Sequence, residues 1–313
     1  MASIAYITDK NMIEYHRVNG NHTINFWKPS TTRKIQDFHV GDFLFFLAKG
    51  TEKGIRKEKG IIGYGKLKKS YTLSFSQMWN RYGCKNGYAS KELLEEAICK
   101  VTKNHKIPDY LNCLILEDLV FFQAPVYLSE IGVEISNSIE SYTYLDKTNI
   151  MNTSKILEVA QSVGVDLWSS MFCKEEHDFL LDAKINVINN ICEKNVCGIY
   201  STHDIRNLYK FSTSVMNHDE RYRFMSNSKI EFMKIMDHRI MIYLPCIVNS
   251  NEFLLKFQCL LGHYMVYQSY LSKTTYKDDI QICLLFNQPL QEEYKGMLEQ
   301  LQIQYEERLV EMN

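Results

Sequence analysis

A run of basic residues between positions 49 and 69 has the composition of a phosphate-binding surface. Its net charge is about +6, and Tyr64 lies among the lysines. The members are Lys49, Lys53, Arg56, Lys57, Lys59, Lys66, Lys68 and Lys69, opposed by Glu52 and Glu58. Ammonium groups neutralise the phosphates of a nucleic-acid backbone, and interleaved aromatic rings suit bases. We therefore predict phosphate binding by Lys57, Lys59, Lys66 and Lys68, with a solvated loop as the structural alternative.

Catalytic motifs of fixed spacing are not found in the sequence. There is no Gly-x-Ser-x-Gly elbow, no P-loop, no dinucleotide-binding glycine motif that opens a helix, and no His-Glu-x-x-His zinc site. The nine cysteines include no Cys-x-x-Cys pair, which is typical of reduced, buried thiols. From these motifs we therefore predict no catalytic residue, no metal site and no cofactor.

The composition is that of an ordinary globular chain. Its 313 residues correspond to about two domains, 45% of them are apolar, and the net charge is −1. No apolar run approaches the ~20 residues that span a bilayer, and the N-terminus lacks the pattern of a secretory signal. The expectation is a cytoplasmic protein without a membrane partner.

The first half of the chain is predicted to consist mainly of short strands. Apolar runs bounded by turn residues favour a barrel or a sandwich over a doubly wound sheet. The runs are Asp42–Leu47, Gly60–Leu67, Leu111–Leu116 and Leu119–Phe122. A helix interrupts them after Ser90, which is a good N-cap residue.

The second half is predicted to be a mixed α/β domain. A short helix that follows Thr153 and stops at Gly164 is interpreted as the linker. Hydrophobic periodicity then predicts a helix over 179–191, a hairpin, and alternating helices and strands. The later elements are the hairpin Ile230–Met236 and Arg239–Val248, the helix Asn251–Leu271, the strand Ile280–Phe286 and the helix Gln291–Met312. The predicted domains are 1–147 and 174–313, joined by a helical linker over 148–173.

Three motifs in the first 145 residues resemble the EVE-like branch of the PUA superfamily. They are Trp27-Lys28-Pro29, the turn Gly41-Asp42 before an apolar strand, and Ile61-Ile62-Gly63-Tyr64-Gly65. The segments Met78–Tyr88 and Cys113–Phe122 look like the version found in bacterial restriction proteins. The resemblance implies a small PUA-like β-barrel with flanking helices that holds a modified or flipped base in an aromatic pocket.

The resemblance points to a base-binding set of residues. Flat side chains stack on a base, and an amide reads its edge. The candidates are Trp27, Trp79, Tyr64 and Tyr88 for the walls and Asn86 for the edge. The structural alternatives are a core position for each tryptophan and a turn at Asn86-Gly87.

The order of elements from 174 to 310 resembles a PD-(D/E)XK nuclease core. Glu231 falls where the first acid of that family lies, but Tyr243 and Pro245 occupy the positions of its metal-binding motif. His263, Tyr267 and Gln268 match the helix that carries a Gln-x-x-x-Tyr signature. The C-terminal half therefore has two open interpretations. It is either a degenerate nuclease fold that serves binding or assembly, or an unrelated α/β module. A displaced active site would use Glu175, Glu176, Asp219 or Glu220.

Together these observations predict a reader of modified double-stranded DNA in a bacterial defence or restriction system. The C-terminal domain would form a homodimer or dock an effector. The alternatives are a metal-dependent, type IV-like restriction endonuclease, which would need Mg²⁺, and a reader of modified RNA. Glu231 is the weak catalytic candidate of the nuclease alternative.

Overall fold

The computed structural model describes most of the chain. The described residues are 3–29, 35–55, 57–102, 104–133, 135, 139, 141–172, 178–195, 198–226, 228–237 and 239–309. Arg56, Glu175 and Glu176 lie outside them. The fold is α+β, as predicted, and the chain divides into unit 1 (Met1–Ala183) and unit 2 (Lys184–Asn313). The predicted domain limits at residues 147 and 173 stay a prediction.

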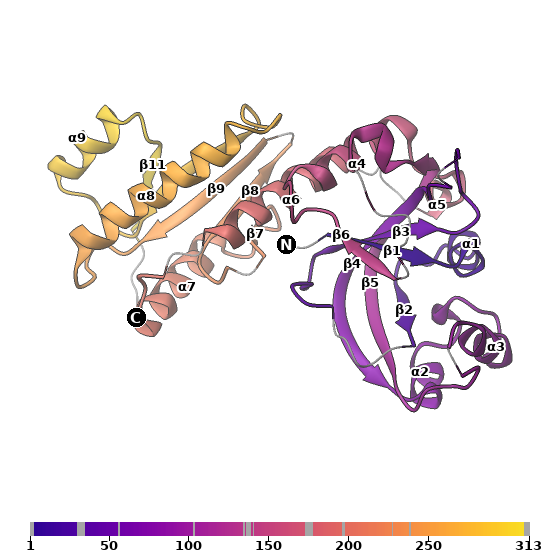
Figure 1. Cartoon of the computed structure of the whole chain (residues 1–313). Helices are drawn as coiled ribbons and strands as arrows, with labels where there is room; N and C mark the ends of the chain where they lie inside the picture. Colours follow the sequence, from indigo (N-terminus) through magenta and orange to yellow (C-terminus); the bar gives the residue numbers. More distant parts are fainter. Residues whose placement is uncertain are drawn as a thin grey trace. The chain divides into compact units, whose positions relative to one another are not determined.

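Unit 1 is built on a curled six-stranded sheet (Figure 1). Neighbouring strands are antiparallel except β1 and β3, which are parallel. In sheet order the strands are β2 (Ile24–Lys28), β5 (Leu111–Val126), β4 (Ile61–Leu73), β3 (Phe43–Ala48), β1 (Ile4–Thr8) and β6 (Tyr142–Tyr144). The ring of Tyr6 on β1 lies 5.0 Å from that of Phe26 on β2, although three strands separate β1 from β2. The sheet is therefore curled into a barrel-like shape.

The curl depends on irregularities between β4 and β5. The register between these strands shifts three times, and Asp118 has a left-handed φ of 50°. Bulges of this kind bend a strand pair and increase its twist. The prediction of two separate strands over Leu111–Leu116 and Leu119–Phe122 is wrong, because the bulge bends β5 without ending it.

Helices cover the sheet of unit 1, and α1, α2 and α3 begin at residues whose side chains cap them. The Oγ of Ser90 accepts a hydrogen bond from the Leu93 N–H, as predicted, and Ser74 forms a capping box with Gln77. Gly164 ends α4 with a φ of 85°. The helices are α1 (Lys10–Val18), α2 (Phe75–Tyr82), the 3-10 helix η1 (Gly83–Asn86), α3 (Lys91–Val101), the 3-10 helix η2 (Leu128–Ile131), α4 (Asn152–Val163) and α5 (Leu167–Phe172).

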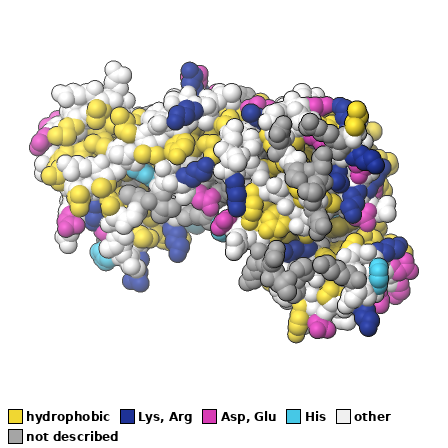
Figure 2. Space-filling model, viewed as in Figure 1, with side chains coloured by type: hydrophobic (Ala, Val, Ile, Leu, Met, Phe, Trp, Pro, Cys, Tyr) yellow, Lys and Arg dark blue, Asp and Glu magenta, His cyan; other side chains and the backbone are white. Residues whose placement is uncertain are grey.

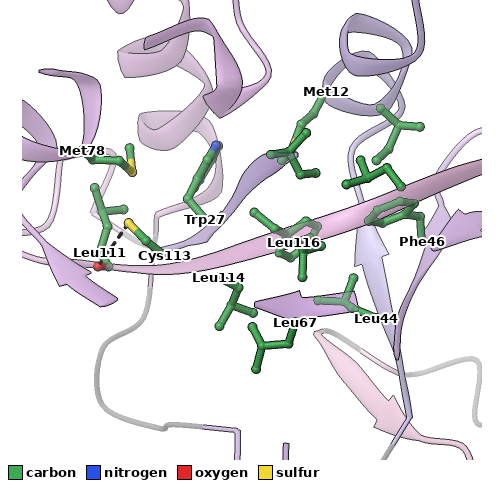
Figure 3. Packing of buried hydrophobic residues seen from close by; sticks show 14 of the residues in the cluster. Met12, Trp27, Leu44, Phe46, Leu67, Met78, Leu111, Cys113, Leu114 and Leu116 are labelled. Atoms are coloured by element: carbon green, nitrogen blue, oxygen red, sulfur yellow. Dashed lines mark hydrogen bonds between the residues drawn. The ribbon is translucent and has the colours of Figure 1, made fainter. Parts of the chain in front are cut away.

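The core of unit 1 lies on both faces of β5. Figure 3 shows Trp27 and Cys113 on one side of this strand and Leu114 with Leu67 on the other. Trp27 and Cys113 belong to the same buried cluster as Met78 of α2. This alternation decides which side chains line the inside of the curl.

Unit 2 contains a five-stranded sheet. Its strands, in sheet order, are β11 (Tyr305–Glu307), β10 (Ile280–Phe286), β9 (Arg239–Cys246), β8 (Phe232–Met236) and β7 (Tyr222–Phe224). β7, β8 and β9 are antiparallel, whereas β9, β10 and β11 are parallel. The predicted hairpin is confirmed, with Met236 opposite Arg239.

Among the described residues, the helices that accompany this sheet are α6 (Phe179–Lys194), whose first residues belong to unit 1, α7 (Thr202–Met216), α8 (Phe253–Leu271) and α9 (Glu292–Gln300). The prediction of one helix over Gln291–Met312 is wrong. The chain leaves α9 through a turn in which Gln302 has a φ of 53°, and then pairs Tyr305 with Leu284 as edge strand β11. An edge strand with two glutamates has no apolar alternation that would reveal it.

The surface view shows where charges and apolar groups lie. On the face that Figure 2 shows, Lys and Arg side chains alternate with Asp and Glu side chains rather than forming one basic strip. Among the exposed apolar side chains are Leu254, Leu255 and Met265 of α8. Within the part of the chain that the structure describes, no helix combines the length and apolarity that crossing a membrane requires.

Candidate functional site

A cavity of about 270 Å³ opens at the mouth of the curled sheet in unit 1. Barrel mouths are frequent ligand sites, because strand ends bring side chains of several strands together. The residues around this cavity are Lys28, Ile35, Phe38, Leu67, Ser70, Tyr71, Thr72, Asn112 and Leu114. We call it the barrel-mouth cavity.

Three polar side chains that line the barrel-mouth cavity lie in one row across β2, β5 and β4. The strand register places Lys28 of β2 beside Asn112 of β5, and Asn112 beside Thr72 of β4. The Thr72 hydroxyl donates to Asn112 Oδ1 over 3.2 Å. An ammonium, a carboxamide and a hydroxyl in a row offer the donors and acceptors that read the edge of a base.

Burial changes the chemistry of Lys28. Its side chain is 6% exposed, and this burial lowers the pKa of its ammonium from the ordinary value. A partly desolvated ammonium forms stronger hydrogen bonds to carbonyl oxygens than an exposed one. Lys28 is therefore the polar group of the cavity with the largest expected contribution to ligand binding.

The apolar wall comes from the connection between β2 and β3. Ile35 and Phe38 line the cavity and pack against the core of unit 1. Leu67 and Leu114 add apolar surface from the sheet. A flat ring, aliphatic side chains and a polar row are together the surroundings that a nucleobase needs.

Sequence reasoning missed these residues, although a signal for Lys28 was present. Trp27 and Lys28 are neighbours in one strand, so they must face opposite sides of the sheet. Trp27 was predicted to bind a base because of its large aromatic ring, but the residue of this pair that lines the cavity is Lys28. Phe38, Asn112 and Thr72 carry no local signal, because only strand pairing and the chain connection bring them to Lys28.

Trp27 and Asn86 have structural roles. The indole Nε1–H of Trp27, which is 9% exposed, donates to the carbonyl oxygen of Asn86 over 3.1 Å. The Asn86 amide is fully buried, donates to Gly83 O and accepts from Asn25 Nδ2. Both hydrogen-bonding atoms of the amide are occupied, so we correct its assignment as a base reader. The turn alternative at Asn86-Gly87 is the one found.

Trp79 and Tyr88 lie near that turn. The ring of Tyr88 is tilted against Trp27 at 6.5 Å, and its hydroxyl donates to Asp9 Oδ2 over 3.4 Å. Burial and Asp9 raise the pKa of Tyr88 above the ordinary value. Trp79, on α2, is half-buried against the core. The structure thus brings Trp27, Asn86 and Tyr88 together, but places none of them around the barrel-mouth cavity.

Tyr64 lies elsewhere, among aromatic rings on β3 and β4. It is fully buried, within 5.1 Å of the Phe43 ring and 5.4 Å of the Phe45 ring. Its hydroxyl donates to Asp182 over 2.7 Å, and burial together with Asp182 raises the pKa of this phenol far above its usual value. A ring enclosed on all sides cannot stack on a base, so the assignment of Tyr64 as a base-binding residue is corrected.

The predicted phosphate-binding lysines differ in their partners. Lys66 contacts Asp182 at 2.9 Å and Asp118 at 3.4 Å, so its charge is neutralised within unit 1. Lys68 pairs with Glu117 at the surface, where such pairs contribute little and open readily. No ion pair involves Lys57 or Lys59 among the described residues. We therefore retain Lys57, Lys59 and Lys68 as phosphate candidates and drop Lys66.

Buried His16 contacts the turn that holds Asn86. A Cβ on Gly87, whose φ is 88°, would approach His16 Nε2 to 3.0 Å. The Asn21 amide lies 3.2 Å from His16 Nδ1, and Nε2 has no hydrogen-bond partner among the described residues. Burial lowers the pKa of this imidazole from 6.5 to about 3.

This shift predicts that acid destabilises unit 1. The unfolded chain binds a proton at His16 near pH 6.5, whereas the folded chain resists it. The stability contribution is complete above pH 6.5 and falls by about 1.4 kcal/mol per pH unit toward pH 3. Between pH 7 and pH 5, the chain should lose ~2 kcal/mol more of its unfolding free energy than a His16→Gln variant. Denaturant unfolding at both pH values measures this, and equal losses would contradict the account.

Glu231 of unit 2 is enclosed by hydrogen-bond partners. It is 7% exposed, and its carboxylate accepts a hydrogen bond from the Tyr267 hydroxyl over 2.7 Å. The carboxylate also lies 2.8 Å from His263 Nε2 and 3.4 Å from Cys192 Sγ. Burial and the Glu231 charge raise the pKa of both Cys192 and Tyr267 above the ordinary values. Tyr243, at the position of the family's metal motif, donates to Glu306 over 3.2 Å. Glu231, His263 and Tyr267 thus form a hydrogen-bonded cluster, which the sequence did not predict.

Asp219 and Glu220, the described candidates for a displaced nuclease active site, lie at the surface. Asp219 is paired with Arg221 at 2.7 Å, and this arginine holds the pKa of Asp219 at about 2. Glu220, its neighbour, is exposed. Within the described ranges, no three His, Cys, Asp or Glu side chains are arranged to hold a metal ion.

Comparisons with known proteins find likenesses to solved structures only over about half of the chain. No family model and no curated protein matches the chain. The crystal structure of ASCH from Zymomonas mobilis shares 17% identity with a TM-score of 0.36, and covers 50% of this chain and 94% of its own. Two single-residue variants of that protein match at 16% and 15% identity, with TM-scores of 0.34 and 0.37. They cover 51% and 50% of this chain, and 97% and 95% of their own. These values are too low to assign the chain to a family.

Proposed function

We propose that unit 1 binds nucleic acid and takes one base into the barrel-mouth cavity. The observation that carries this proposal is the row of Lys28, Asn112 and Thr72 in a cavity that Phe38 also lines. Extrusion of a base costs a few kcal/mol of stacking, which contacts to the ring face and to the edge of the base must offset. The cavity offers both kinds of contact.

We propose modified double-stranded DNA as the ligand, in a bacterial defence or restriction setting. The added group of a modified base gives the cavity a contact that the unmodified base lacks, and this contact offsets part of the cost of extrusion. Leu67 and Leu114 offer apolar surface for an added group, beside the polar row. Lys57, Lys59 and Lys68 would contact phosphates and orient the strand without reading its sequence.

Binding of labelled oligonucleotides tests the proposal. Fluorescence anisotropy compares DNA duplexes that contain 5-methylcytosine, 5-hydroxymethylcytosine or N6-methyladenine with unmodified duplexes and with RNA. Removing a ring that stacks on a base costs ~1–3 kcal/mol, so Phe38→Ala should weaken binding of the preferred ligand about 5- to 150-fold. Lys28→Gln should weaken it and reduce the preference for the modified base.

Val40→Ala is the matched control for Phe38→Ala. Val40 lies in the same connection, is 63% exposed and does not line the cavity. Lys57→Ala and Lys59→Ala should weaken binding of every sequence and reduce the salt slope by about one per lost contact. Equal affinity of Phe38→Ala and the unaltered chain would refute the cavity as the base site, and tighter binding of modified RNA would select the RNA alternative.

Unit 2 is proposed to serve assembly or docking rather than cleavage. The Glu231 carboxylate is engaged by Tyr267 and His263, which supports a structural role for it. The exposed Leu254, Leu255 and Met265 of α8 support a homodimer or an effector contact through this unit. The metal-dependent endonuclease with a displaced active site remains the alternative, and an assay for cleavage of a modified duplex with Mg²⁺ or Mn²⁺ distinguishes the two.

A further inference from the structure

Two cationic side chains lie against one tyrosine ring of unit 1. Arg81, in the last turn of α2, has its guanidinium carbon 4.4 Å from the centre of the Tyr71 ring of β4. The ammonium nitrogen of Lys69, two residues earlier in β4, lies 5.1 Å from the same ring centre. A single residue, Ser74, separates β4 from α2, and this short connection keeps Arg81 close to the strand. We call Lys69, Tyr71 and Arg81 the basic cluster.

The Arg81 guanidinium is oriented by aromatic side chains. Its Nη2 donates a hydrogen bond to the Tyr71 hydroxyl over 3.4 Å, and the centre of the Tyr82 ring lies 5.6 Å from its central carbon. A planar guanidinium held against aromatic rings loses less side-chain entropy when it binds a ligand than a freely moving one. Its remaining N–H groups match the spacing of two oxygens of one phosphate.

The charges of the basic cluster are not neutralised within the described part of the chain. There, neither Lys69 nor Arg81 forms an ion pair, and both side chains are exposed. Lys68, the neighbour of Lys69, is instead paired with Glu117. Two positive charges beside one ring repel each other, so an anion that contacts both of them is stabilised by both.

The Tyr71 phenol responds to this positive charge. A hydrogen bond from Lys69 lowers the pKa of the phenol from its ordinary value, and the charges of Lys69 and Arg81 lower it further, although partial desolvation has the opposite effect. The lowered pKa means that negative charge is favoured at the Tyr71 oxygen. The same surroundings therefore favour an anionic oxygen of a ligand at this place.

The basic cluster adjoins the barrel-mouth cavity through β4. Ser70, Tyr71 and Thr72 all line the cavity. Since neighbouring residues of a strand point to opposite faces, the Tyr71 ring and the Thr72 hydroxyl lie on opposite faces of β4. The register of β3 with β4 ends at Lys66, so among the described residues Tyr71 and Thr72 have strand partners in β5 alone. A nucleic-acid strand that crosses this edge of β4 can place a base on the cavity side and a phosphate on the other.

We propose that the basic cluster binds one phosphodiester group of a nucleic-acid backbone. Arg81 contacts two phosphate oxygens, and Lys69 supplies the second positive charge. This phosphate lies next to the base that enters the barrel-mouth cavity, so the cluster positions the strand without reading its sequence. The inference rests on the proposal that unit 1 binds nucleic acid, and it assigns the backbone contact to residues outside the cavity.

Fluorescence anisotropy with the full chain tests this inference. The probes are a DNA duplex that contains 5-methylcytosine, the unmodified duplex, and a duplex with one abasic site. Arg81→Gln should weaken binding of all three about tenfold and reduce the salt slope by about one. Lys69→Gln should reduce the slope similarly. Arg81→Lys keeps the charge but loses the planar fork, so the slope should stay while part of the affinity is lost.

Lys53→Gln is the matched control. The Lys53 ammonium also lies over a tyrosine ring, 4.7 Å from the centre of Tyr127, but it is paired with Glu130. This variant should change affinity less than about twofold, because surface ion pairs leave little free charge for a ligand.

The failure of this inference differs from the failure of the cavity as a base site. If the unaltered chain binds DNA and Arg81→Gln has the same affinity and salt slope, the basic cluster is overturned while the cavity stands. If Phe38→Ala binds as the unaltered chain does and Arg81→Gln binds more weakly, the cavity is overturned and the backbone contact is supported. Absence of binding to any of the three duplexes would overturn both.

Discussion

Replacing Gly63 by alanine is expected to lower the unfolding free energy of unit 1 by about 3 kcal/mol. A Cβ at this position would overlap the carbonyl oxygen of Val120 and press on the Phe121 backbone. These atoms belong to β5, which pairs with β4 at the bulges that curl the sheet. Backbone cannot move aside as a flexible side chain can, so the cost appears as strain or as loss of the bulge.

Chemical denaturation of the variant and its control measures this cost. Gly132→Ala is the control, because Gly132 has a φ of 69° but nothing lies within 4 Å of its Cβ position. It should cost only the ~1–2 kcal/mol of a left-handed alanine. Similar losses in both variants would show that φ, and not the close approach of β4 to β5, explains the glycine in the Ile-x-Gly-x-Gly motif.

Replacing Glu231 by alanine is expected to lower the unfolding free energy of unit 2 by ~3 kcal/mol. The variant leaves the Tyr267 hydroxyl and His263 Nε2 buried without their acceptor, and it opens a small cavity beside Cys192. Glu231→Gln keeps an acceptor oxygen and should lose less. Binding of nucleic acid by unit 1 should be unchanged in both variants.

A double-mutant cycle with Tyr267→Phe separates the hydrogen bond from the packing. The loss in the double variant should be smaller than the sum of the single losses, since each single change already breaks the same bond. The same proteins test the endonuclease alternative. Cleavage of a modified duplex in the presence of Mg²⁺ or Mn²⁺, lost in Glu231→Ala and Glu231→Gln alike, would replace the structural role of Glu231 with a catalytic one.

Much of the secondary structure could be predicted because its signals are local. Ser90 caps α3 as predicted, since an N-cap depends on residues within one turn. The strand Ile280–Phe286 has the predicted limits, because a buried parallel strand is apolar almost throughout, with Gln281 as the one polar residue here. The bulge at Asp118 and the edge strand β11 could not be predicted, because each depends on a neighbouring strand rather than on its own sequence.

The candidate site was predictable only in part. The basic run was visible in the sequence. The neutralisation of Lys66 by Asp182 was not, because it depends on a contact between residues 116 positions apart. Similarly, Tyr64 and Asn86 have side chains of the kind that bind bases. In the folded chain, however, Tyr64 is enclosed by other side chains, and the amide of Asn86 is hydrogen-bonded to Asn25 and Gly83. Side-chain type indicates which chemistry is available, whereas burial decides whether a ligand can reach it.

The amino-acid sequence by itself determined the α+β class, the position of the hairpin and the charge of the 49–69 segment, because composition, periodicity and local caps specify them. Only the tertiary structure decided that Lys28, and not Trp27, faces the barrel-mouth cavity beside Asn112 and Thr72. The physical reason is strand pairing. The pleat sends neighbouring residues to opposite faces, and the register between β2, β5 and β4 sets which distant side chains share one face.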